Sequence, residues 1–182
     1  MTDSGAQVST RSGDDGYTSL LGPGRVPKYS PRPNAFGTLD EASAALGMAR
    51  ATCSDEKVRP LIHEFQLGLY KLMAELATPA EQYEKVPFKM KSEDVERLNE
   101  ISTELKQHVV IGKVFVIPGA TQCGATLDLA RTIVRRGERL VAELTHQGEL
   151  TNPHVIEWLN RLSDCVFILA RFVERDVDAV AE

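Results

Sequence analysis

The amino-acid sequence of 182 residues is poor in cysteine, tryptophan and other aromatic residues, and it has no long apolar run. Its three cysteines, Cys53, Cys123 and Cys165, form no CxxC pair, so we expect no zinc or redox motif but reduced thiols in a cytoplasmic protein. No segment approaches the roughly 20 apolar residues of a transmembrane helix, which argues against a membrane protein. Residues 1–10 lack both the apolar core of a signal peptide and the arginines of a transit peptide.

The charged residues and the histidines argue against two further classes of protein. The 21 basic residues are outnumbered by 26 acidic ones, and a net charge of -5 does not suit a chain that coats nucleic acid. The 4 histidines have neither HxxH nor HExxH spacing, so we expect no metal bound by protein ligands. The P-loop pattern GxxxxGK[ST] is also absent, because the Gly112-Lys113 pair is followed by Val114.

What the sequence has is helical patterning, which follows a loop at residues 1–33 rich in Gly, Ser, Pro and Asp. Apolar residues recur at helical spacing in the segments 34–51, 55–77, 92–108, 125–148 and 152–177. Asn34, Ser92 and Asn152 are the expected N-caps, and Pro153 suits the first helical position. Residues 80–91 are expected to form a linker.

The segment 109–124 is rich in β-branched residues and contains a Pro-Gly pair. Its pattern alone permits a strand, but no partner strand is visible elsewhere, so we interpret it as an extended connector. The predicted fold is therefore all-α. It is a five-helix up-and-down bundle over residues 34–182, preceded by a long N-terminal glycine/proline-rich loop over residues 1–33, in a single domain.

The strongest chemical feature is a stripe of charge on the fourth predicted helix. Arg131, Arg135, Glu138 and Arg139 stand at helical spacing on one face, and Arg136 lies beside them. Three arginines on one stripe repel each other unless an anion neutralises them, and the planar guanidinium suits phosphate oxygens. The stripe indicates either a polyphosphate site or a solvated helix face.

Weaker features lie elsewhere in the chain. The segment 10–19 mixes glycines with hydroxyl residues, which suits an anion-binding loop, and Lys28 adds a cation; a tail without a ligand is the alternative. Asn160 and Asp164 share a face of the last helix, where they either bind a ligand or are simply solvated. Asp40 lies in the first helix, whose dipole favours acidic residues near its start.

Four blocks, taken together, carry a resemblance to a known family: "TRSGDDGYTSL" at 10–20, "FGTLDEASAALG" at 36–47, "FVIPGATQCGATLDLARTIVRRGERLV" at 115–141 and "LNRLSDCVFILAR" at 159–171. The chain resembles the trimeric cobalamin adenosyltransferases of the propanediol-utilisation type. The resemblance implies a five-helix bundle, a homotrimer, and transfer of the 5′-deoxyadenosyl group of ATP to cob(I)alamin with release of triphosphate. Magnesium would share the charge of the phosphates.

The resemblance also implies site residues. The positions that match ATP contacts are Thr10, Arg11, Ser12, Gly13, Thr18, Ser19, Lys28, Arg135, Arg136, Gly137, Glu138, Arg139 and Asn160. Asp40 and Arg131 match a carboxylate and an arginine that pair across the subunit interface. Phe115 matches the aromatic residue beneath the corrin. We expect Arg135, Phe115 and this ion pair to carry the catalytic work.

Two residues depart from the usual pattern of the family. Gly137 stands where alanine is usual, and a glycine inside a helix is expected to loosen that turn. Asp128 stands where many members have histidine. The alternative to an enzyme is a module that binds ATP or adenosylcobalamin for delivery or sensing. The expected partners of an enzyme are a cobalamin reductase and an adenosylcobalamin-dependent mutase or dehydratase.

Overall fold

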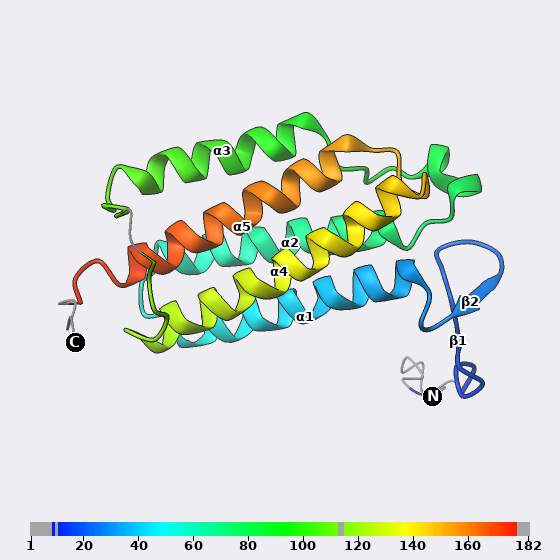
Figure 1. Ribbon diagram of the computed structural model, residues 1–182, viewed down its shortest axis with the longest axis horizontal. Coiled ribbons are helices and arrows are strands. Elements are labelled where there is room, and N and C mark those ends of the chain that lie inside the picture. The colour runs from blue at the N-terminus through cyan, green and yellow to red at the C-terminus, as the bar shows by residue number, and fades with distance from the viewer. Residues whose placement is uncertain (1–8, 10, 113–114, 178–182) are drawn as a thin grey trace, which may run out of the picture.

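The computed structural model describes residues 9, 11–112 and 115–177, and in these ranges the chain forms five α-helices and a small two-stranded sheet (Figure 1). The elements, in chain order, are β1 (Tyr17–Ser19), β2 (Arg25–Pro27), α1 (Pro31–Thr52), α2 (Val58–Leu76), a 3-10 helix (Ala80–Lys85), α3 (Ser92–Lys106), α4 (Gln122–His146) and α5 (Pro153–Val173). The predicted all-α bundle is confirmed. None of these helices is long and apolar enough to cross a membrane.

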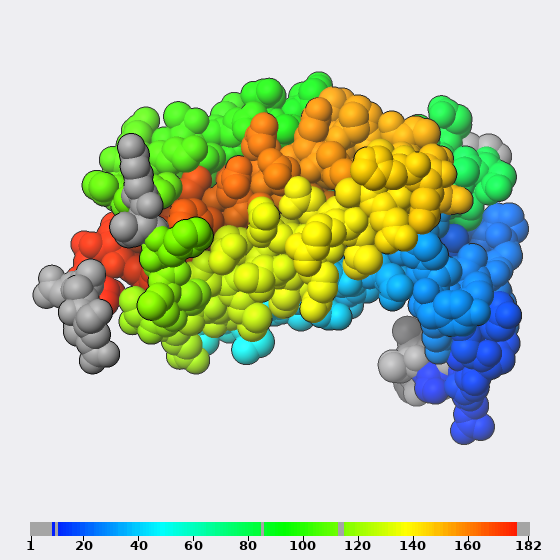
Figure 2. Space-filling model, viewed as in Figure 1, coloured from blue at the N-terminus to red at the C-terminus, as the bar shows by residue number. Residues whose placement is uncertain are grey.

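Successive helices run in opposite directions, so each end of the bundle collects a different set of loops (Figure 1). Helix α4 packs against both α1 and α5, while α2 lies on α1 and α3 lies on α5. We call the end that carries β1 and β2 the hairpin end. The opposite end holds the described residues between α3 and α4, 109–112 and 115–121, and we call it the connector end. The body is elongated, and the hairpin projects from it beside the start of α1 (Figure 2).

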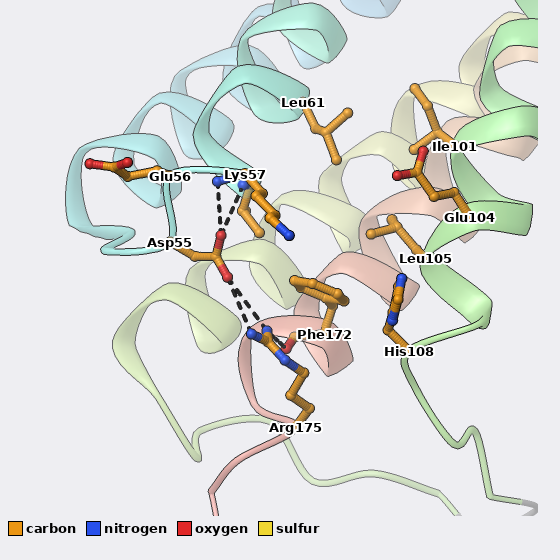
Figure 3. A pocket seen from close by; sticks show the side chains of 11 residues that line it. Asp55, Glu56, Lys57, Leu61, Ile101, Glu104, Leu105, His108, Phe172 and Arg175 are labelled. Carbon is orange, nitrogen blue, oxygen red and sulfur yellow. Dashed lines mark hydrogen bonds and ion pairs between the residues drawn. The ribbon is translucent and has the colours of Figure 1, made fainter.

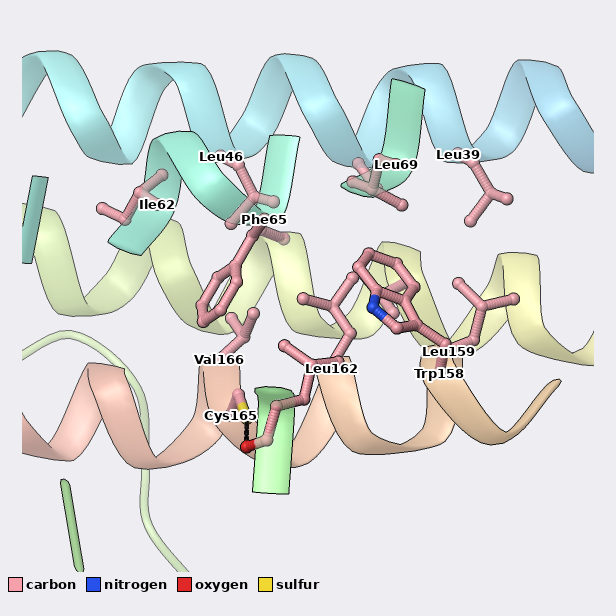
Figure 4. Packing of buried hydrophobic residues seen from close by; sticks show 14 of the residues in the cluster. Leu39, Leu46, Ile62, Phe65, Leu69, Trp158, Leu159, Leu162, Cys165 and Val166 are labelled. Atoms are coloured by element: carbon pink, nitrogen blue, oxygen red, sulfur yellow. Dashed lines mark hydrogen bonds between the residues drawn. The ribbon is translucent and has the colours of Figure 1, made fainter. Parts of the chain in front are cut away.

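The core is built from apolar side chains that recur at helical spacing on all five helices. Leu46, Phe65, Leu159 and other large side chains meet between the helices (Figure 4). Trp158, only 3 % exposed, lies against the backbone of α2, where a Cβ at Gly68 would come within 2.2 Å of its ring. A glycine at this position is therefore what allows the indole to enter the core.

A buried carboxylate ties the loops together at the hairpin end. Glu75, fully buried, accepts hydrogen bonds from the Met90 amide (2.6 Å), from Nδ2 of Asn152 (2.8 Å) and from the hydroxyl of Tyr83. Burial, together with the adjacent Glu75 carboxylate, raises the pKa of Tyr83 well above its usual range. Asn152 also accepts from the His154 amide (3.1 Å), which confirms it as the N-cap of α5.

Several predicted boundaries differ from the structure. The segment expected to be an unstructured loop contains the antiparallel pair β1–β2, and α1 begins at Pro31 with Ser30 as its N-cap. Asn34 lies inside this helix, because the preceding Pro31 already has the backbone angle that a helix requires. Ser92 is the first helical residue, with Lys91 at the capping position, and the linker at 80–91 includes the short 3-10 helix.

Candidate functional site

The charged stripe of α4 forms one wall of a pocket between α4 and α5. The pocket has a volume of about 360 Å³, and its polar lining is Arg135, Glu138 and Arg139 from α4 and Glu157, Asn160 and Arg161 from α5. Four of these six residues were predicted from the sequence as site residues, and the fold brings them together. Arg161 was missed, because a lone arginine beside Asn160 carries no pattern of its own.

Hydrogen bonds orient the side chains of this arginine pocket. Glu138 accepts from Nδ2 of Asn160 (3.1 Å), whose Oδ1 accepts from Arg161 (2.9 Å). Arg139 donates to the backbone oxygen of Arg135 (2.9 Å). Within the described part of the chain, the Arg135 guanidinium makes no hydrogen bond or ion pair, so all its donors remain available to an anion. The pocket thus has the chemistry of a phosphate site.

The two residues between Arg135 and Glu138 turn away from the arginine pocket. Arg136 pairs with Glu41 of α1. Gly137 is buried against α1, where a Cβ would lie 2.4 Å from Cδ2 of Leu39. The sequence predicted only that Gly137 loosens its turn; the structure shows that the glycine also permits close packing of the two helices.

The hairpin is organised by an ion pair that the sequence analysis did not anticipate. Arg25 on β2 binds both carboxylate oxygens of Asp15 (2.8 and 2.7 Å) and donates to the backbone oxygens of Tyr17 (3.1 Å) and Ser12. The Arg25 guanidinium lowers the pKa of Asp15 to about 2. Nζ of Lys28 donates to the backbone oxygen of Gly13 (2.7 Å), and this hydrogen bond joins the residue after β2 to the turn before β1.

The predicted residues of the N-terminal loop stand apart from the arginine pocket of the same chain. Thr18 and Ser19 belong to β1, and Arg11, with a φ of 58°, lies in the turn before it. The hairpin leaves the bundle beside α1, on the side away from α5 (Figure 1). Thr10 lies outside the described residues.

The connector, residues 109–121, carries a run of exposed apolar side chains. The Phe115 side chain is fully exposed, and the side chains of Val110 and Ile117 are almost fully exposed. Its described residues, 109–112 and 115–121, form neither helix nor strand, as the sequence predicted, whereas residues 122–124, also expected in the connector, form the first turn of α4. An exposed apolar patch of this kind indicates a surface that another molecule covers.

The residues predicted to form an ion pair between subunits are not paired with each other within one chain. Asp40 is exposed on α1. Arg131, on the first half of α4, uses Nε to pair with Asp128 of its own helix (3.0 Å).

A larger hollow of about 860 Å³ opens at the connector end between α2, α3 and α5 (Figure 3). Its floor is apolar and includes Leu61 and Phe172, and the edge of the His108 ring packs on Phe172 with a centroid distance of 6.2 Å. On its rim, Asp55 accepts from the amide of Lys57 (2.9 Å), which secures the start of α2. None of the predicted site residues lines this hollow.

The described residues hold no group of three His, Cys, Asp or Glu side chains suited to a metal ion. The three cysteines are buried and unpaired with one another by disulfides. Burial raises the pKa of Cys123 and of Cys165, which favours the protonated thiol at neutral pH.

Comparison with known proteins places this helical bundle in one family. The sequence pattern of the cobalamin adenosyltransferase family matches residues 8–173, and the chain belongs to that family. It is 36% identical over 169 residues to the corrinoid adenosyltransferase PduO of Salmonella typhimurium, covering 93% of this chain and 50% of that protein. The chain thus spans about half the length of that relative.

Other relatives match over most of their length. A corrinoid adenosyltransferase of Citrobacter freundii is 33% identical over 175 residues, which cover 96% of this chain and 99% of that protein. Among solved structures, a variant of the PduO-type ATP:corrinoid adenosyltransferase from Lactobacillus reuteri, complexed with cobalamin and ATP, superposes with a TM-score of 0.85. It is 32% identical and covers 93% of this chain and 96% of that one.

Proposed function

We propose that the protein is an ATP:corrinoid adenosyltransferase, which moves the 5′-deoxyadenosyl group of ATP to the cobalt of cob(I)alamin. The observation that carries this proposal is the arginine pocket between α4 and α5, in a chain of the cobalamin adenosyltransferase family. Cobalt supplies the electron pair for the new cobalt–carbon bond, while the bond from the 5′ carbon to triphosphate breaks and triphosphate leaves. The protein needs neither a nucleophile nor a base for this step.

The task of the arginine pocket is then to bind the triphosphate and stabilise the charge that it gains as it leaves. Arg135 is the first candidate, since its whole guanidinium fork is available, and Arg139 adds a second positive charge. Glu138, oriented by Asn160, would offer a carboxylate to a magnesium ion, which would neutralise part of the phosphate charge.

The hairpin would close over the nucleotide from a neighbouring subunit. Ser12, Gly13 and Lys28 do not line the arginine pocket of their own chain, and in a homotrimer with sites between subunits the hairpin of one subunit would meet the pocket of the next. Arg11, Thr18 and the other predicted loop residues would provide donors to the phosphates or the sugar. We also propose that Arg136 and Gly137 act by packing α4 on α1 and not by contact with ATP.

Corrinoid binding would use the connector. Phe115 presents a fully exposed ring, which suits an apolar platform under a flat macrocycle. Asp40 of one subunit would pair with Arg131 of the next subunit, and this ion pair would lie at the edge of the corrinoid site. A cobalamin reductase would supply the electron, and a mutase or dehydratase would use the product. The free thiols suit the reducing cytoplasm.

An anaerobic optical assay tests the proposed activity. Protein is mixed with Mg-ATP and chemically reduced cobalamin, and the cobalt(I) absorption band is followed. We expect the band to decay as adenosylcobalamin appears. Arg135→Ala should lower kcat/KM by roughly 100-fold or more, because a group that stabilises developing charge is lost.

The matched control is Arg59→Ala, which removes an exposed arginine of α2 outside the arginine pocket and should leave the rate unchanged. A band that persists in the wild-type protein while ATP still binds would contradict the catalytic proposal. It would favour instead a module that binds ATP or adenosylcobalamin for delivery or sensing.

A further inference from the structure

The first half of α4 holds a buried charged network that is separate from the arginine pocket. Asp128 is 2 % exposed and accepts from two guanidinium groups: Nε of Arg131 at 3.0 Å and Nη2 of Arg171 at 2.6 Å. The same Nη2 atom lies 2.7 Å from a carboxylate oxygen of Glu174. Two carboxylates therefore face two guanidinium groups, and the network has no net charge.

Burial fixes the members of this network in place. Arg171 is 9 % exposed, and its Nε and Nη1 atoms have no hydrogen-bond partner among the described residues, so its carboxylate partners are essential to it. Glu174 reaches α4 only because Gly124 has no side chain: a Cβ there would lie 2.1 Å from its carboxylate. The ring of Phe167 packs against both guanidinium groups, with Cζ distances of 5.8 Å to Arg131 and 5.3 Å to Arg171.

Arg131 is held at one edge only. Its Nε is bound by Asp128, while its terminal nitrogens make no hydrogen bond with the described residues, and its side chain remains 25% exposed. A guanidinium is planar and presents its donors in a fixed fork. Binding at Nε therefore sets the direction in which the remaining donors point.

We infer that Asp128 and Arg171 are positioning residues: Arg171 holds the carboxylate of Asp128, which in turn aims the free edge of Arg131 at a partner outside its own subunit. The inference rests on the proposed function, in which that partner is Asp40 beside the corrinoid. Without the Asp128 carboxylate, the Arg131 guanidinium keeps its charge, but its orientation is no longer fixed. The effect should therefore fall on the corrinoid and leave ATP alone, since the arginine pocket lies on the second half of α4.

The test is steady-state kinetics on the full chain with Asp128→Asn, which keeps the shape of the side chain and removes its charge. We expect the KM for cobalamin to rise about tenfold, the size of a typical coupling between contacting residues. The KM for ATP should stay within about twofold of the wild-type value. Glu96→Gln, which removes an exposed carboxylate from α3, is the matched control and should change neither constant.

A double-mutant cycle separates positioning from mere stability. If Asp128 acts through Arg131, Asp128→Asn causes no further loss of activity in an Arg131→Ala background, although the melting temperature still falls. Independent losses of activity in the two variants would overturn the inference. Should Asp128→Asn fail to fold, Arg171→Lys takes its place, with the same expected rise in the KM for cobalamin.

Three outcomes are distinguishable. An unchanged KM for cobalamin in a folded variant of an active enzyme overturns this inference and leaves the proposed function intact. A wild-type protein that does not turn over cobalamin overturns both. Failure of both variants to fold assigns the network to stability alone, which also overturns the positioning role.

Discussion

Gly137 shows how a single missing methyl group decides the distance between two helices. Replacing it with alanine favours the helix by about 1 kcal/mol, but the new Cβ would meet Leu39, and overpacking of this kind costs about 1–3 kcal/mol. We expect Gly137→Ala to lower the free energy of unfolding by about 1 kcal/mol in urea denaturation. Trimming Leu39 to alanine should relieve the contact, so the double variant should be more stable than the sum of the single changes. An increase in stability on Gly137→Ala would show that α1 shifts without cost.

The individual residues divide into those that a sequence can reveal and those that it cannot. Arg135, Glu138 and Arg139 were found because one helix brings them to one face by spacing alone. Asp128 and Arg171 lie 43 residues apart in the chain, and no local sequence pattern indicates that they pair. Asp128 was singled out as unusual, but its partner became visible only when α4 and α5 were packed together.

Among the elements, the hairpin carries an exposed ion pair between Arg25 and Asp15. The depressed pKa of Asp15 means that its pair with Arg25 is complete above the ordinary value, 3.8, and is lost as the pH falls through about 2. We expect the NMR resonances of the Arg25 side chain and the Tyr17 amide to move in this window. Asp15→Asn should show the acid-like positions already at pH 6, while Asp14→Asn should not. Resonances that stay constant from pH 5 to pH 2 would contradict the assignment.

The helices were predicted well and the hairpin was not, for a physical reason. Five long segments of apolar periodicity leave a strong pattern, and Asn152 marked the start of α5 correctly. Strands of three residues, such as Tyr17–Ser19, are too short for alternation to be recognised. The start of α1 was missed because Pro31 and Pro33 resemble loop residues, although proline fits the first turn of a helix.

For the whole molecule, the separation of hairpin and arginine pocket predicts complementation between subunits. Lys28→Ala damages only the hairpin and Arg135→Ala only the pocket, so each homotrimer should be inactive. Each site between subunits would combine the hairpin of one subunit with the arginine pocket of the next. In randomly mixed trimers, about one site in four then has both parts intact, as expected for a head-to-tail ring. We therefore expect co-expression of the two variants to restore about a quarter of wild-type activity per site. No recovery in verified mixed trimers would mean that both parts of each site come from one chain.

The packing of Trp158 against Gly68 has a practical consequence. It is the only tryptophan of the chain, it is 3 % exposed, and it lies two positions before Asn160 on the same helix. The protein thus carries a single tryptophan fluorophore, shielded from water and placed one turn or less from residues of the arginine pocket. Unfolding exposes the indole to water and moves its emission maximum to longer wavelengths. A change around α5 in the folded state would alter the emission separately, so both can be followed without an added label.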